Sequence, residues 1–331
     1  MMKRDYMKEA IAHRSPARVP FMIHLTGDAM GLYGDRLLDE YQNSDAIKAM
    51  REGRISKAQA VNLSIGNYGI GVSGPWWDWY EVPACYQEPD APEILPKTRG
   101  TGSYSDFEKQ VQFLRDNFYC YITAFYYGSH FEKANFARGI ENFLADLAGE
   151  PEFAEQILSA IIRKNMVMLE NMVYHPEIDG VLLGSDWGSQ QSLLMSPAIW
   201  RDMIKPGEQK EYDLIHGAGR DVWVHSCGNI EQILPELVQM GVNVLNPVQP
   251  ECMDIVALKR KFGESLTFWG GISTQQTLPY GSPEEVKKET QAVIETMGQN
   301  GGYITAPAQE IQGDVPYENL KALIDTARYY G

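Results

Sequence analysis

The sequence predicts an α/β protein built as a single (β/α)₈ barrel, and three observations support this prediction. From about residue 134 onward, short runs rich in β-branched residues alternate with amphipathic stretches of helical length. Such alternation is typical of parallel strands joined by helices. The chain of 331 residues has the length of one large barrel, and no linker or shift in composition marks a boundary. We therefore expect one domain over residues 1–331.

In the N-terminal half, we expect a helical extension followed by two strands. The chain begins with an amphipathic stretch, and the apolar runs at residues 18–23 and 61–65 predict the first and second strands. Residues 66–104 are rich in Gly, Pro and aromatic side chains and lack helical periodicity. They predict a long, aromatic-rich loop inserted after a strand, and long loops of this kind are often functional.

The second half predicts five strands, each of which precedes a helix. These strands span residues 180–183, 221–225, 242–246, 266–269 and 302–305. The helices begin with an N-capping serine or with proline, as at Ser196, Ser282 and Pro316. Glycines mark the returns from helix to strand, where helices commonly end in a left-handed residue.

The charge of the chain excludes several classes of partner. The formal net charge is −15 and the isoelectric point is about 4.9, which argues against binding to nucleic acid or to anionic membranes. No run approaches the roughly 18 apolar residues that a membrane span requires. The four cysteines are too few and too scattered for a disulfide scaffold. We expect a soluble, cytoplasmic protein, and the sequence leaves a homodimer open.

Polar residues follow the predicted strands, at the ends where a (β/α)₈ barrel carries its active site. They are His24, Asp186, Gln190, His225, Cys227, Asn246, Gln249, Gln309, Glu310 and Asp314. Their positions alone make these residues candidates for catalysis and substrate binding.

The segment from His225 to Cys227 is the most distinctive of these strand ends. Alternate residues of a strand point to the same side, so the imidazole and the thiolate can converge on one soft cation, and zinc suits this pair. A third ligand must come from another strand end, where the chain offers Gln309 or Glu310. The alternative is that His225 is a hydrogen-bonding residue lining the barrel and Cys227 a small buried side chain.

Other candidates have two interpretations each. Asp186 could act as a general acid or base or anchor the substrate, or it could cap the following turn. The tryptophans around Trp77 could line a pocket for a planar substrate, or anchor the loop on the barrel rim. Four further histidines lie away from predicted strand ends, and we expect surface or packing roles for them: His13, His130, His175 and His216.

Six segments along nearly the whole chain carry a family resemblance. They are EAIAHRSPARVP at 9–20, DWGSQ at 186–190, HSCGN at 225–229, LNPVQ at 245–249, WGGI at 269–272 and DVPYEN at 314–319. With these segments the chain resembles the uroporphyrinogen decarboxylase superfamily, which includes the cobalamin (corrinoid)-dependent methyltransferases. The resemblance implies a (β/α)₈ barrel.

Within that superfamily, the chain is more similar to the methyltransferase branch. True decarboxylases share an Arg-Gln-Ala-Gly-Arg stretch after the first strand that grips substrate carboxylates, and residues 23–28 lack it. The methyltransferases share a zinc motif of His-x-Cys plus a distant Cys. His225 and Cys227 match its first part, whereas Gln309 stands where the distant Cys is expected. Gln309 or Glu310 could complete an oxygen-containing site instead.

The resemblance implies methyl transfer between a small molecule, either a methoxylated aromatic or a thiol, and a corrinoid carried by a partner protein. Zinc held by His225, Cys227 and Glu310 would act as a Lewis acid. The catalytic residues would be Asp186, His225 and Glu310, and the substrate would be bound by His24, Trp77, Gln190, Asn246, Gln249 and Gln309. The alternatives are decarboxylation of a tetrapyrrole and a non-catalytic barrel that binds a tetrapyrrole.

Overall fold

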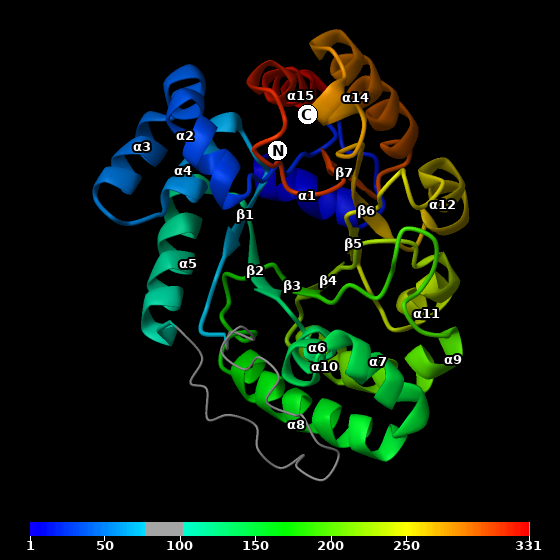
Figure 1. Ribbon diagram of the computed structural model, residues 1–331. Helices are drawn as coiled ribbons and strands as arrows, with labels where there is room; N and C mark the ends of the chain where they lie inside the picture. The colour runs from blue at the N-terminus through cyan, green and yellow to red at the C-terminus, as the bar shows by residue number, and fades with distance from the viewer. Residues whose placement is uncertain (77–101, 331) are drawn as a thin grey trace. The chain divides into compact units, whose positions relative to one another are not determined.

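The computed structural model describes residues 1–76 and 102–330, and in them it shows an α/β protein whose strands and helices alternate (Figure 1). Along the sheet, the strands follow in the order in which they occur in the chain. They are β1 (Gly69–Val72), β2 (Tyr121–Tyr127), β3 (Gly180–Gly184), β4 (Asp221–His225), β5 (Val244–Asn246), β6 (Thr267–Ile272) and β7 (Tyr303–Pro307). The five strands predicted in the second half are confirmed to within two or three residues at each end.

The chain packs as two compact units. The first unit comprises residues 1–71, 110–123 and 243–331, and the second comprises residues 72–109 and 124–242. The single domain expected over the whole chain stays a prediction.

In the first unit, three neighbouring strands pair in parallel. Val244 of β5 lies opposite Thr267 of β6, and Phe268 of β6 lies opposite Tyr303 of β7. The helices of this unit are α1 (Lys3–Ile11), α2 (Gly27–Tyr41), α3 (Ser44–Arg51), α4 (Lys57–Ile65), α12 (Ile255–Phe262), α13 (Thr277–Tyr280), α14 (Pro283–Met297) and α15 (Tyr317–Tyr330).

The predicted first strand is only partly present. Residues 18–25 run parallel to the segment that contains β7, but they pair with it only through isolated bridges from Phe21 to Thr305 and from Leu25 to Ile311. The extended run therefore carries His24 to the same side of the first unit as the end of β7, without forming a regular strand.

The predicted second strand, residues 61–65, is wrong because this run belongs to helix α4. Ser56 caps that helix by accepting a hydrogen bond from the Gln59 backbone, and Gly66 ends it at a φ of 103°. Every residue from Gln59 to Ile65 is buried. A helix buried on all sides loses the amphipathic period by which helices are recognised, which explains the error.

Strand β1 lies inside the range predicted as a long loop. The part of that range that includes Trp77, residues 77–101, lies outside the described residues, so the aromatic-rich insertion stays a prediction. Helix α5 (Tyr104–Phe118) follows this segment.

In the second unit, β3 and β4 pair in parallel and end level with each other, because Gly184 lies opposite His225. The residues that follow each strand therefore emerge side by side. The helices here are α6 (His130–Arg138), α7 (Ile140–Gly149), α8 (Pro151–Glu170), α9 (Pro197–Ile199), α10 (Lys205–Gly217) and α11 (Leu234–Gln239). A π-helical turn over Trp200–Ile204 joins α9 to α10, within the single helix predicted there.

Candidate functional site

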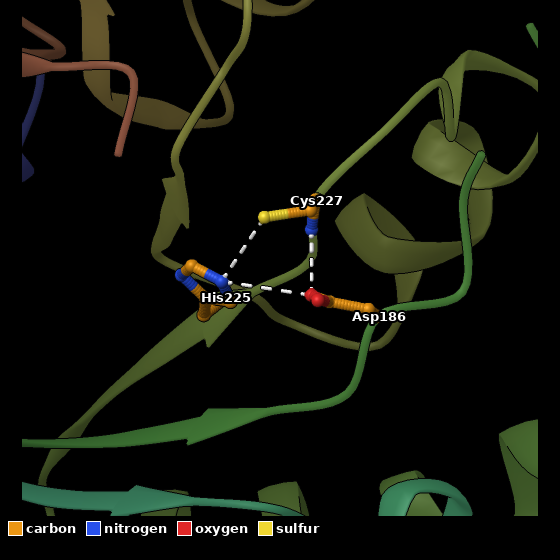
Figure 2. Close-up of side chains that lie close together, drawn as sticks. All are labelled: Asp186, His225 and Cys227. Atoms are coloured by element: carbon orange, nitrogen blue, oxygen red, sulfur yellow. Dashed lines mark hydrogen bonds and ion pairs between the residues drawn. The ribbon is translucent and has the colours of Figure 1, made fainter. Parts of the chain in front are cut away.

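Three side chains with different donor atoms meet at the ends of β3 and β4 in the second unit (Figure 2). His225 Nε2 lies 3.4 Å from Cys227 Sγ and 3.5 Å from Asp186 Oδ1. The donor atoms of all three residues lie within 4.8 Å of one another. The predicted convergence of His225 and Cys227 is present, and the carboxylate beside them is Asp186.

Backbone hydrogen bonds hold the two strand ends together. The Cys227 N–H donates to Asp186 Oδ1 at 2.9 Å, and the Trp187 N–H donates to Ser226 Oγ at 3.1 Å. Each loop thus donates a backbone N–H to a side-chain oxygen of the other loop. This reciprocal bonding fixes the Asp186 carboxylate against the His225 and Cys227 pair before any ligand binds.

Two glycines allow this close approach. Gly228 has a φ of 81°, a conformation that favours glycine, and a Cβ there would overlap the Gly188 carbonyl group. A Cβ on Gly188 would lie 2.7 Å from the Cys227 carbonyl oxygen. The Gly residues in the DWGSQ and HSCGN segments therefore serve the packing of one loop against the other.

Glu132 is a site residue that sequence reasoning missed. It lies in the first turn of α6, is 8% exposed, and accepts a hydrogen bond of 2.8 Å from the Asp186 backbone N–H. Burial raises the pKa of the Glu132 carboxyl to about 7. A strand predicted at the position of β2 would have marked Glu132 as a residue that follows a strand end.

The Asp186, His225 and Cys227 donors fit a zinc ion. Zinc binds nitrogen and oxygen at about 2.0–2.2 Å and sulfur at about 2.3 Å, which places neighbouring tetrahedral donors about 3.3–3.7 Å apart. The observed separations of 3.4 and 3.5 Å fall in this range. The sequence assigned the third ligand to Glu310, which belongs to the first unit. That assignment, like the other roles, stays a prediction.

The first unit contains a polar cavity of about 400 Å³ that four of the candidate residues line. Gln249, Gln309 and Glu310 line it, together with Gln275 and Asp314. The surrounding walls desolvate the Glu310 carboxyl and raise its pKa, although part of the side chain stays exposed. The cavity combines amide groups, which donate and accept hydrogen bonds, with two carboxyl groups.

His24 and Asn246 both contact Trp269 in the first unit. The His24 and Trp269 rings meet edge to face with centroids 5.6 Å apart, and Asn246 Nδ2 donates to the Trp269 carbonyl at 2.9 Å. Burial lowers the pKa of His24 to about 4, so its imidazole is neutral at pH 7. In the second unit, Gln190 is exposed in the loop after β3.

The comparisons with known proteins identify the family of the chain. Residues 128–330 match the uroporphyrinogen decarboxylase (URO-D) family, and the chain belongs to that family. No curated protein matches the sequence significantly. The resemblance found in the sequence is confirmed.

Among solved structures, the chain is similar to a methyltransferase from Methanosarcina mazei, with 18% identity over 100% of both chains and a TM-score of 0.71. This likeness shows a fold of the TIM-barrel type and confirms the predicted fold class at that level. A vitamin-B12 independent methionine synthase from Listeria monocytogenes is more distant, with 11% identity over 96% of both chains and a TM-score of 0.47.

Proposed function

We propose that the chain is a corrinoid-dependent methyltransferase that moves a methyl group between a small molecule and a corrinoid held by a separate partner protein. The observation that carries this proposal is the convergence of Asp186, His225 and Cys227 at two neighbouring strand ends. Membership of the URO-D family and the likeness to a methyltransferase support it. We also propose that the chain forms a closed eight-stranded barrel and is located in the cytoplasm.

In this mechanism, Cys227 Sγ, His225 Nε2 and an Asp186 oxygen would hold zinc. When bound, zinc supplies a Lewis acid that lowers the pKa of a substrate thiol or hydroxyl and makes its heteroatom a better methyl acceptor or leaving group. The Cys227 N–H keeps Asp186 Oδ1 in place through a hydrogen bond of 2.9 Å. Because the Asp186 side chain is 33% exposed, it can also reach solvent or substrate and take up the proton that the heteroatom loses.

The substrate would be bound by polar side chains that the sequence singled out. Gln249 and Gln309 line the cavity of the first unit and would hydrogen-bond a polar group of the substrate, with Glu310 beside them. His24, being neutral, would offer an uncharged ring to the substrate. Trp77 and Gln190 keep their predicted roles as further substrate contacts.

Methylcobalamin and a small thiol provide the test. Wild-type protein should cleave the cobalt–carbon bond of methylcobalamin with transfer of the methyl group to the thiol, measured by the change in corrinoid absorbance and by the methylated product. Cys227→Ala should lower the rate by roughly a hundredfold or more, because the metal loses its one sulfur ligand. Cys120→Ala, the same substitution at a buried cysteine of the first unit, is the matched control and should keep the rate.

A Cys227→Ala protein that keeps the wild-type rate would contradict the proposal. Decarboxylation of a tetrapyrrole is the alternative that the family match favours, and it predicts activity on uroporphyrinogen without any corrinoid. Tight tetrapyrrole binding with neither activity would instead identify a non-catalytic barrel.

A further inference from the structure

A second group of potential metal ligands lies in the interior of the second unit. His130 begins helix α6, and Glu208 and Glu211 lie one turn apart on α10. Their exposed fractions are 0%, 1% and 0%, and their donor atoms lie within 4.8 Å of one another. The sequence predicted only a surface or packing role for His130, and the two glutamates gave no signal of their own.

The hydrogen bonds of His130 prepare one ring nitrogen for a cation. His130 Nε2 lies 3.1 Å from the Ile204 carbonyl oxygen, which only accepts, so Nε2 carries the hydrogen. In the neutral ring, Nδ1 then presents a lone pair toward Glu208 Oε1 at 3.2 Å. Metal-binding histidines commonly donate their other ring N–H to a backbone carbonyl in this manner.

The two carboxylates differ in the hydrogen bonds that they accept. Glu211 accepts hydrogen bonds of 2.8 Å on each oxygen, from Ser129 Oγ and from Asn165 Nδ2, so its orientation is fixed. Glu208 Oε1 is buried, and the neutral His130 ring donates no hydrogen bond to it although Nδ1 lies 3.2 Å away. Its nearest partner is the His130 lone-pair nitrogen, and two such acceptors repel unless a positive charge lies between them.

The burial of the three side chains and their net charge both favour a positive charge between them. Two carboxylates beside one imidazole carry a net negative charge even when the ring is protonated. A buried charge without compensation is unfavourable, and a divalent cation would neutralise it.

We propose that His130 Nδ1, Glu208 Oε1 and one oxygen of Glu211 form a second metal site, for a divalent cation of the Mn²⁺, Fe²⁺ and Zn²⁺ class. Nitrogen and carboxylate donors without sulfur suit this class, and the 3.2 Å between His130 Nδ1 and Glu208 Oε1 matches donors that are each about 2.2 Å from one ion. The inference does not depend on the proposed methyl transfer, because Asp186, His225 and Cys227 take no part in it.

The metal would act as a structural clamp within the second unit. It would tie the start of α6, where Glu132 supports the Asp186 loop, to α10. Gly207 is part of this arrangement, since a Cβ there would lie 2.7 Å from His130 Nε2 and would displace the ring.

The test measures metal content in full-length protein from cells grown with added Mn²⁺ and Zn²⁺ and purified without chelator. In a Cys227→Ala background, which removes the sulfur-containing site, elemental mass spectrometry should find about one equivalent of Mn²⁺ or Zn²⁺ per chain. Glu211→Gln added to that background should reduce the content to below about one tenth. Glu155→Gln, the same change at an exposed position on α8, should leave it unaltered.

Gly207→Ala is a second variant that keeps both carboxylates but moves the imidazole, and it should also lose the metal. Folded Cys227→Ala protein that holds less than a tenth of an equivalent of metal would overturn the proposal. The positive charge in the cluster would then be a proton. Metal that persists after Glu211→Gln would overturn it as well, since that metal would then belong to Asp186 and His225.

Discussion

Asp186 combines two functions in the proposed zinc site. Its carboxylate faces the other two donors, and a backbone N–H of the neighbouring loop holds it in place. Its Oδ1 accepts from the Cys227 N–H and lies 3.5 Å from His225 Nε2. The sequence identified Asp186 as an acid, a base or a cap, but it gave no reason to group it with His225. That grouping depends on the level pairing of β3 with β4, which brings together residues 39 to 41 positions apart.

We expect Asp186→Asn to weaken zinc binding by roughly ten- to a hundredfold while leaving the fold intact. The amide oxygen of asparagine can still accept from the Cys227 N–H, but the negative charge beside His225 is lost. Competition with a chromogenic chelator measures the affinity. Asp213→Asn, at an exposed position on α10, is the matched control, and equal affinities in the two variants would refute the role given to Asp186.

His24 predicts a dependence of stability on pH in the acid range. Burial lowers its pKa from 6.5 to about 4, so the unfolded chain binds a proton that the folded chain excludes. The free energy of unfolding is therefore unaffected by His24 above pH 6.5, and it decreases as the pH falls from 6.5 toward 4. At about 1.4 kcal/mol for each pH unit, the loss reaches up to about 3 kcal/mol.

Urea unfolding of wild type and His24→Gln between pH 7 and pH 4 measures this effect. The variant should lose less free energy of unfolding over this range than wild type does. His216→Gln, a substitution at an exposed histidine, should follow the wild-type curve. Parallel curves for wild type and His24→Gln would show that His24 titrates normally in the folded protein.

At the scale of elements, the strands of the second half were predictable because each is a short apolar run that follows a glycine and precedes a helix. Helix α4 was not predictable, because a helix buried on every side carries no amphipathic signal. The cluster of His130, Glu208 and Glu211 could not be predicted either. Its members come from two helices and lie about 80 residues apart in the chain, and nothing local in the sequence connects them.

The contact between the loops after β3 and β4 makes Gly228 the most sensitive glycine of the site. Gly228→Ala places a side chain at a φ of 81° and against the Gly188 carbonyl group, so the loops must separate. We expect a loss of about 2–4 kcal/mol in the free energy of unfolding, together with weaker zinc binding. Gly217→Ala has no atom within 4 Å of the added carbon and lies in a helix, so it should be neutral or slightly stabilising.

Chemical denaturation and zinc titration of the two alanine variants give the comparison. Equal stability and equal zinc affinity for Gly228→Ala and wild type would mean that the two loops do not need the close approach seen here.

At the scale of the whole molecule, the chain belongs to the URO-D family and has a fold of the TIM-barrel type, as the sequence predicted. No helix in the described part of the chain has the length and apolar character needed to cross a membrane. The fold alone leaves the reaction open, because one fold supports many chemistries. The choice between methyl transfer and decarboxylation therefore depends on whether the ends of β3 and β4 hold a metal through Cys227.

Zinc K-edge X-ray absorption tests that claim most directly, on Glu211→Gln protein loaded with one equivalent of zinc so that the second proposed site contributes no signal. The account predicts one sulfur neighbour at about 2.3 Å and two or three nitrogen or oxygen neighbours at about 2.0–2.2 Å, with the sulfur absent in Cys227→Ala. Zinc surrounded only by nitrogen and oxygen in the Glu211→Gln protein, or no zinc bound at all, would contradict it.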